Sequence, residues 1–180
     1  MTRRKLSVGG AVLGCAAALG VPLGLLWWLL APRPRVTVGR DGMVLPFPVS
    51  EADFAVDGYF ALIMMAAGLV CGYTVYMIQY RLAARDGADL RMACLLGMAA
   101  GSLLGALAAW QVGVLLDAGE FRRAVEAASP GTVVRSGLRL QALSALMAWP
   151  FIAVLQYGLF DAVSLWRGDL PAERRVAADG

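Results

Sequence analysis

The chain has 180 residues, of which 59% are hydrophobic and 16% are charged, and its formal net charge is +3. Globular domains are about 45–50% apolar and about 25% charged. The composition therefore excludes a water-soluble domain, a disordered chain and a disulfide-stapled module, and it predicts an integral membrane protein. The small basic surplus contains no run of five like charges, so we expect no nucleic-acid partner.

Four apolar segments are long enough to cross a membrane. They cover residues of about 7–31, 54–80, 92–116 and 140–166. A hydrocarbon core about 30 Å thick needs ~20 apolar residues in a helix, and helices satisfy their own backbone hydrogen bonds inside lipid. We therefore predict an all-α membrane protein, a four-transmembrane-helix bundle that forms a single membrane domain over residues 1–180.

Two segments outside these spans, about 32–50 and 117–138, are long enough to hold structure. The first has β-branched residues on both sides of a Gly39–Gly42 turn, which is typical of a β-hairpin, and Pro46 ends its second strand. The second opens on a short amphipathic turn, and its Thr132–Val134 stretch is a candidate third strand. Because a lone hairpin is marginal in water, we predict that this strand or a partner completes a small extracytoplasmic cap. Two irregular loops are the alternative.

The basic residues set the predicted orientation. With an even number of spans both termini lie on one side, which we predict to be the cytoplasmic face of the cell membrane. The basic cluster before the first span and the shorter inner segments favour this orientation. The inner side then holds Arg3, Arg4, Lys5, Arg81, Arg85, Arg91, Arg167, Arg174 and Arg175, and the outer side holds Arg33, Arg35, Arg40, Arg122, Arg123, Arg135 and Arg139.

The three cysteines all lie inside apolar segments, where we expect them to act as small hydrophobic residues. Cys15 also follows a basic start and a short apolar run, as the cysteine of a lipoprotein signal does. The apolar run continues to Leu30, whereas a cleaved signal has a core of only about 7–15 residues. We therefore predict an uncleaved first helix.

Tryptophan residues lie near the ends of the spans, and proline residues lie near the centres of two of them. Trp27, Trp28 and Trp166 fall near span ends, where aromatic belts form at a membrane surface. Pro22 and Pro150 fall near span centres, where each removes a backbone donor and is expected to kink its helix.

Small residues repeat along three of the spans. In the third span they recur every four residues, which places them on one helix face. In lipid such a face lets two backbones approach closely. The stripe therefore packs either within the bundle or against a second protomer or another membrane protein. The helix-packing positions that we predict are Gly14, Gly20, Gly24, Gly68, Gly72, Gly97, Gly101, Gly105 and Gly113.

Two polar residues of the fourth span form a candidate intramembrane polar site. Asp161 is an acid inside a span, near its inner end, where water, Arg81 or Arg167 could reach it. Gln156 lies deeper, and a buried amide usually forms a hydrogen bond to another helix. Together these groups line no convincing polar path through the bundle.

The sequence favours no enzyme. It contains no histidine, which removes the commonest general base and metal ligand. It has no metal-ligand cluster, and its glycines are spaced for helix packing, not for a phosphate loop. We therefore expect no catalytic residues, no metal site and no cofactor.

Several apolar motifs of the chain resemble those of a known family. They are Gly20 to Trp27 (Gly-Val-Pro-Leu-Gly-Leu-Leu-Trp), Ala31-Pro32, Asp57-Gly58-Tyr-Phe-Ala, Gly97 to Trp110, and Trp149-Pro150. Over roughly residues 10–165 the chain resembles an uncharacterised family of four-span membrane proteins from actinobacteria, a domain of unknown function. The resemblance implies a fold and a membrane location, and it carries over no activity and no catalytic residue.

The sequence thus favours a structural or accessory subunit of a cell-envelope membrane complex. Its expected partners are the lipid bilayer and a membrane protein, or a second copy of the chain. The alternative is a small oligomeric transporter, or a protein that conducts protons or a solute, with Asp161 and Gln156 as the working residues.

Overall fold

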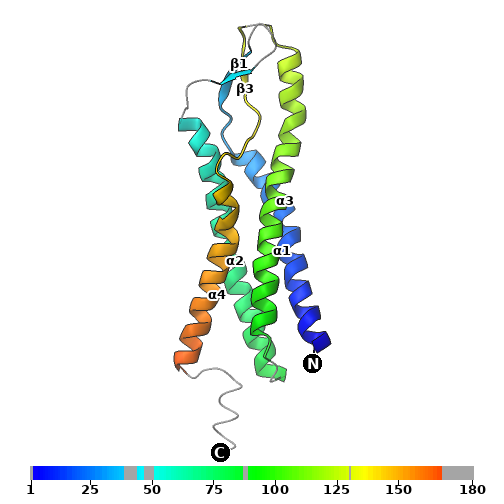
Figure 1. Cartoon of the computed structure of the whole chain (residues 1–180), viewed down its shortest axis with the longest axis vertical. Helices are drawn as coiled ribbons and strands as arrows, with labels where there is room; N and C mark the ends of the chain where they lie inside the picture. The colour runs from blue at the N-terminus through cyan, green and yellow to red at the C-terminus, as the bar shows by residue number, and fades with distance from the viewer. Residues whose placement is uncertain (1, 39–43, 47–50, 87–88, 130, 168–180) are drawn as a thin grey trace, which may run out of the picture.

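A computed structural model describes residues 2–38, 44–46, 51–86, 89–129 and 131–167. Four long helices stand side by side, and short strands lie at one end of them (Figure 1). In chain order the elements are α1 (Thr2–Leu30), β1 (Arg35–Val38), β2 (Val44–Pro46), α2 (Glu51–Asp86), α3 (Arg91–Glu126), β3 (Val133–Arg135), the 3₁₀ helix η1 (Leu143–Met147) and α4 (Ala148–Arg167).

All four α-helices contain a stretch that is long and apolar enough to cross a membrane, as the sequence predicted. The stretches are Arg3–Leu30, Phe54–Arg85, Arg91–Glu126 and, with η1 included, Leu143–Arg167. At 1.5 Å per residue each is longer than the roughly 30 Å of a hydrocarbon core.

Four of the predicted helix boundaries differ from the structure by five residues or more. α1 begins at Thr2 and not near residue 7, and α2 continues to Asp86 and not to about residue 80. The helix expected to end near residue 116 continues to Glu126 without a break, because the polar residues that follow still favour a helix that is already formed. The fourth helix was expected from about residue 140, but η1 precedes it and α4 begins only at Ala148. Before η1, the Asp57 carboxylate accepts hydrogen bonds from the backbone N–H groups of Gln141 (3.0 Å) and Ala142 (2.9 Å), which fastens that stretch to α2.

The two prolines differ in their positions. Pro22 lies inside α1, as expected. Pro150 lies in the first turn of α4 and not near a helix centre, because α4 begins later than predicted. In a first turn the missing N–H has no intrahelical acceptor to lose, so Pro150 is compatible with a regular helix.

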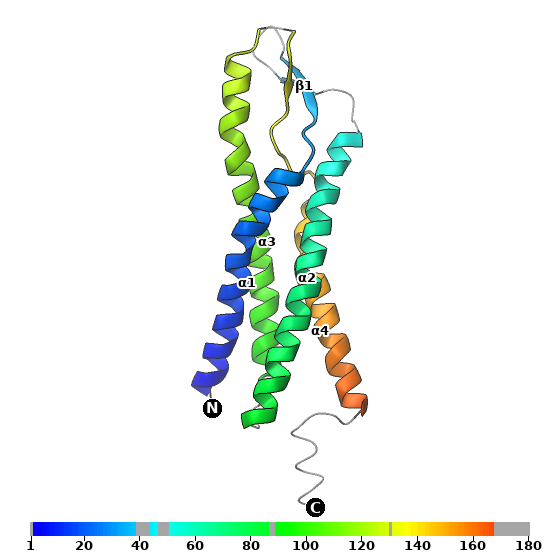
Figure 2. The same cartoon turned by 180° about the vertical axis from the view of Figure 1, so that it is seen from behind.

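The helices pair out of chain order. The most extensive contacts join α1 to α3 and α2 to α4, and a smaller contact between α3 and α4 joins the two pairs. Figures 1 and 2 show α1 beside α3, and α2 beside α4, from opposite sides.

The α1–α3 pair is held at backbone contact by small residues. A Cβ atom on Gly20 would collide with the Gly105 carbonyl oxygen, and one on Gly24 would lie 2.5 Å from the Ala109 carbonyl oxygen. From α3, a Cβ on Gly101 would lie 2.7 Å from the Leu13 carbonyl oxygen. Gly97 and Gly113 are equally tight, against Gly9 and the Trp27 ring. The stripe on α3 therefore faces α1, inside the bundle.

Gly14 was predicted to be a helix-packing position, but within this bundle it packs against no other helix. It is exposed, and a Cβ built on it would meet nothing within 4 Å. Gly14 and Gly20 are six residues apart, which places them about 120° from each other around the helix. Gly14 therefore points away from the face that Gly20 and Gly24 present to α3.

The α2–α4 pair also uses two glycines. A Cβ on Gly68 would lie 2.9 Å from both the Trp149 carbonyl oxygen and the Ile152 Cβ. A Cβ on Gly72 would lie 2.9 Å from the Ala153 carbonyl oxygen. These contacts set the spacing of the second pair.

Two fully buried tryptophans join the pairs. Trp27 of α1 donates a hydrogen bond from Nε1 to the Val56 carbonyl oxygen of α2 (3.2 Å), and its ring meets Phe60 edge-on with 4.9 Å between centroids. Trp149 of α4 lies against Gly105 of α3. The position of Trp27 near a span end had suggested an aromatic belt. That prediction is wrong, because Trp27 belongs to the core. Trp166 is 88% exposed.

The strands form a small antiparallel sheet in the order β2-β1-β3. β1 pairs with β2 with Thr37 opposite Leu45, and with β3 with Val36 opposite Val134. The predicted hairpin and its completion by a third strand are thus confirmed, and β2 ends at Pro46 as expected. The expected Gly39–Gly42 turn lies outside the described residues.

We expect Gly20→Ala to destabilise the protein, because the new methyl group must displace the α3 backbone; overpacking of this kind costs about 1–3 kcal/mol. The matched control is Gly14→Ala on the same helix, where the methyl group meets open space and helix propensity improves. Thermal unfolding in detergent measures both. Equal melting temperatures for the two variants would show that α1 and α3 do not meet at Gly20.

Candidate functional site

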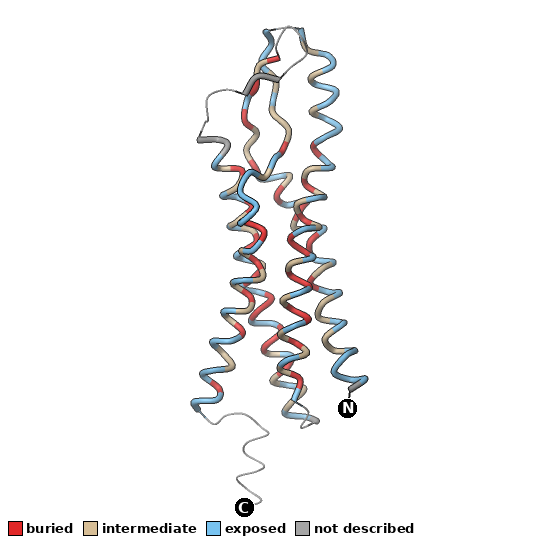
Figure 3. Tube along the Cα trace, viewed as in Figure 1, coloured by how far each residue is buried: buried red, intermediate tan, exposed pale blue. Residues whose placement is uncertain are grey.

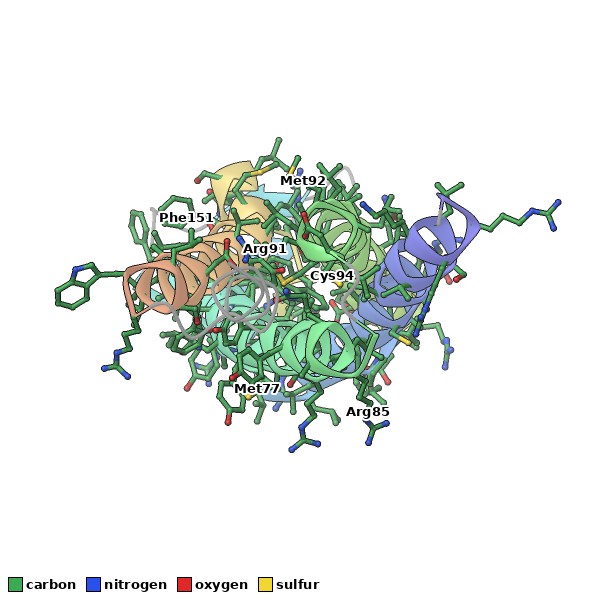
Figure 4. All side chains as sticks on the ribbon, turned by 90° about the horizontal axis from the view of Figure 1, so that it is seen from below. Met77, Arg85, Arg91, Met92, Cys94 and Phe151 are labelled. Carbon is green, nitrogen blue, oxygen red and sulfur yellow. The ribbon has the colours of Figure 1, made fainter. Side chains whose placement is uncertain are left out.

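As names only, we call the end of the bundle that carries the sheet the outer end and the opposite end the inner end. Asp161 pairs with Arg91 at the inner end. The Arg91 Nε and Asp161 Oδ1 atoms are 3.5 Å apart, and the two side chains are 27% and 22% exposed. Viewed from below, Arg91 lies among the helices and Arg85 at the periphery (Figure 4). The sequence had suggested Arg81 or Arg167 as the partner. Arg91 was missed because it belongs to another helix, and the sequence does not show how α3 and α4 face each other.

Hydroxyl groups surround this ion pair. The Tyr157 hydroxyl of α4 donates to the Arg91 carbonyl oxygen (3.4 Å), and the Tyr76 hydroxyl of α2 is hydrogen-bonded to the Ser164 hydroxyl of α4. The Tyr76 and Tyr157 rings meet edge-on with 5.9 Å between centroids. These five residues, which we call the inner polar cluster, tie α4 to both α2 and α3.

Gln156 lies apart from this cluster. It is half-buried, and its Oε1 atom, which has no hydrogen-bond partner among the described residues, faces Gly72 of α2. Gln156 and Asp161 are five residues apart, about 140° around the helix. The structure therefore does not bring the two predicted polar residues together. A second amide that the sequence analysis missed, Gln79 of α2, is 1% exposed, and its Oε1 is also without a partner in the described part of the chain.

A second polar centre lies at the outer end, where the helices meet the sheet. Asp117 of α3 is only 3% exposed. Its Oδ1 atom accepts from Arg33 Nε at 3.0 Å, and its Oδ2 atom accepts from the Leu138 backbone N–H at 2.5 Å. Each carboxylate oxygen therefore holds a different outer segment.

Arg33 completes this centre from the other side. Its guanidinium donates to the Trp28 carbonyl oxygen at 2.8 Å and to the Ala31 carbonyl oxygen at 3.0 Å. It also lies over the Trp28 ring, 5.6 Å from the centroid. Arg33 thus satisfies the Trp28 carbonyl in the last turn of α1, which has no donor within the helix, and the Ala31 carbonyl just after the helix. We call Arg33, Asp117 and the Leu138 amide the outer clasp.

The sequence analysis assigned Arg33 and Asp117 to outer segments and gave neither a role. One signal pointed to Asp117, because it follows Gly113 by four residues and so extends the small-residue face of α3 by one more turn. A carboxylate in that position faces α1 and the chain that leaves it.

An open groove lies beside the clasp, between the outer part of α3 and β3. Its cavity measures about 340 Å³, at the lower end of the size range of ligand pockets. Phe121 closes its base by packing against Gly137, where an added Cβ would lie 3.3 Å from the ring. The groove is lined by Arg33, Asp117, Glu120, Phe121, Ala124, Val134, Arg135 and Ser136.

The described residues contain no group of three His, Cys, Asp or Glu side chains that could hold a metal ion. Cys15, Cys71 and Cys94 are free thiols; Cys15 is exposed and the other two are buried. Comparisons of the chain with protein-family models, with curated proteins and with solved structures gave no match. The inner polar cluster and the outer clasp with its groove are therefore the two candidate sites.

Asp117→Asn is expected to destabilise the protein by about 3 kcal/mol, because it leaves the Arg33 charge without its partner in a largely buried site. The matched control is Glu120→Gln, which removes an exposed carboxylate from the same helix and should change stability by at most about 0.5 kcal/mol. The measurement is thermal unfolding in detergent. If the two variants have the same melting temperature, the clasp contributes no net stability.

Proposed function

We propose that this chain is a multi-pass protein of the cell membrane that acts as a structural or accessory subunit of a cell-envelope complex. Membrane insertion is supported by large apolar side chains that are exposed on all four helices. Figure 3 shows exposed positions, in pale blue, along each of these helices. Each of the following is more than 60% exposed: Leu29, Leu62, Val70, Leu96, Leu115, Phe151 and Leu159. In water such a surface is a large aggregation-prone patch, whereas in lipid it is the solvated face.

An orientation with the cap outside is part of this proposal. Basic residues at the end of the bundle that carries the N-terminus, such as Arg85 and Arg91, favour the cytoplasm for that end. The sheet, the outer clasp and the groove then face the outer side.

The observation that carries the accessory role is the rigid mounting of the cap. The outer clasp fastens the chain after α1 and the chain before η1 to one carboxylate of α3. Beside it the groove remains open, with Glu120 on its α3 wall and Arg135 on its β3 wall. A fixed, open, charged groove held just above a membrane suits the docking of another protein's outer segment.

We expect the full-length chain, purified in mild detergent, to retain a partner protein in a fixed ratio. Glu120→Arg should release that partner, because it reverses a charge in the groove. Glu126→Arg makes the same change on the same helix outside the groove and should retain it. Quantitative mass spectrometry of the eluates measures the ratio. A chain that elutes alone, or equal loss with both variants, would contradict a docking role for the groove.

The alternative is a small protein that conducts protons or a solute. The two buried amide oxygens without partners, on Gln79 and Gln156, favour it, because such groups bind water or a polar solute when they line a path. Asp161 Oδ1 also lacks a hydrogen-bond partner among the described residues, but the Arg91 charge 3.5 Å away compensates the carboxylate, as in a structural ion pair, which argues against a conducting role.

Flux measurements in liposomes decide between these functions. For a conducting protein, Asp161→Asn should reduce flux at least about tenfold, as expected for a relay group. Ser7→Ala, at the exposed start of α1, provides a control that leaves the bundle unchanged. For the accessory function that we favour, the native chain gives no flux above empty liposomes, and neither variant differs from it.

A further inference from the structure

Two arginines lie directly opposite each other on the sheet of the cap. The register of β1 and β3 pairs Arg35 with Arg135. Residues directly opposite in an antiparallel pair share one face of the sheet, with Cβ atoms about 4.5–5.5 Å apart. Both arginines are exposed, whereas Val36, one residue further along β1 and on the other face, is buried. Two guanidinium groups therefore extend from the same open face.

Neither arginine has a partner among the described residues, in a hydrogen bond, an ion pair or a ring contact. The contrast is with Arg33, two residues before Arg35, which is fully engaged in the outer clasp. Like charges directly opposite on a sheet are destabilising. Within the described part of the chain, the pair thus places two positive charges side by side with no acidic partner.

The pair lies at the base of the cap, next to the end of α1. Arg33 is fixed to the last turn of α1, and a strand rises about 3.3 Å per residue, so Arg35 begins roughly 7 Å further on. The pairing with β3 holds Arg135 at the same height. Leu29 and Leu30, at the end of α1, are 62% and 52% exposed. In the proposed membrane this is the level at which hydrocarbon gives way to headgroups.

We propose that Arg35 and Arg135 together bind the phosphate group of an anionic phospholipid in the outer leaflet. This inference rests on the proposed membrane insertion and orientation. A guanidinium group matches phosphate oxygens with two parallel N–H donors, and two such groups on adjacent strands neutralise the phosphate from one side. The height of the pair, at the headgroup level, favours a lipid over an acidic segment of a protein.

The test titrates the full-length protein in detergent with phosphatidylglycerol and measures bound lipid by native mass spectrometry. The native chain should bind phosphatidylglycerol in preference to phosphatidylcholine of the same chain length. Each arginine near a membrane surface contributes roughly a fivefold factor, so Arg35→Gln with Arg135→Gln should weaken binding about 25-fold. The matched control is Arg122→Gln with Arg123→Gln, which removes the same charge from the exposed outer end of α3 and should change binding less than twofold.

Several outcomes would overturn the inference. Equal weakening in both double variants would show attraction to the overall charge and no site at the sheet. Unchanged lipid binding in the Arg35/Arg135 double variant would show that the pair is not a lipid site. If that variant also lost a partner protein, the pair would be assigned to protein binding. Inorganic phosphate that binds as tightly as the lipid would make free phosphate the ligand. The melting temperature of the double variant should not fall, because a repulsive pair is removed.

Labelling with an impermeant maleimide separates failure of this inference from failure of the proposed function. Thr132→Cys, in the cap, should react in intact cells, and Arg85→Cys, at the inner end of α2, should react only after lysis; the unsubstituted chain measures any reaction of the native thiols. The reverse pattern, or extraction of the chain from membranes by alkali, rejects the proposed function and this inference with it. The expected pattern together with unaffected lipid binding rejects the lipid site alone.

Discussion

The backbone contact between α1 and α3 is the constraint on which the rest of the structure depends. Gly20 and Gly24 of α1 admit the α3 backbone at Gly105 and Ala109, and only residues without a large side chain allow this approach. Contacts of this kind gain energy from dispersion and not from the exclusion of water, which makes them suitable in lipid. Because the contacts recur every four residues over several turns, a slip along the helices would drive side chains into backbone at every step.

The same register determines the polar chemistry at the outer end. The face of α3 that carries Gly105 and Gly113 ends at Asp117, one turn further on. With α1 fixed against that face, the chain leaving α1 brings Arg33 within hydrogen-bond distance of Asp117. The clasp then fixes the segment at Leu138 and, with it, the approach to α4. Burying the Arg33–Asp117 pair is costly in itself. The glycine contacts between α1 and α3 position the two side chains so that they meet.

Composition and periodicity predicted the four apolar helices, the hairpin and its third strand, because these depend on local sequence. Contacts that depend on a partner helix were not predictable in this way. The position of Trp27 near a span end fits both an aromatic belt and a core. Its contacts with Val56 and Phe60 of α2 show that it belongs to the core. Gly14 and Gly20 lie about 120° apart on α1, and only the position of α3 shows that the contact uses the face of Gly20 and not that of Gly14. Arg91 and Asp161 meet across two helices, so neither helix alone indicates the pair.

The out-of-order pairing of the helices has a consequence for the biogenesis of the chain. A ribosome delivers α1 and α2 first, yet the principal partner of α1 is α3 and that of α2 is α4. In the proposed membrane, the small-residue faces of the first two helices therefore stay uncovered until their partners are made, and β1 likewise lacks β3, which follows α3. Synthesis proceeds at about 5–20 residues per second, so this waiting period lasts for seconds. Until α3 is complete, the glycine face of α1 is open to any other membrane helix with a matching groove, and it is during translation that this chain is most exposed to a wrong partner.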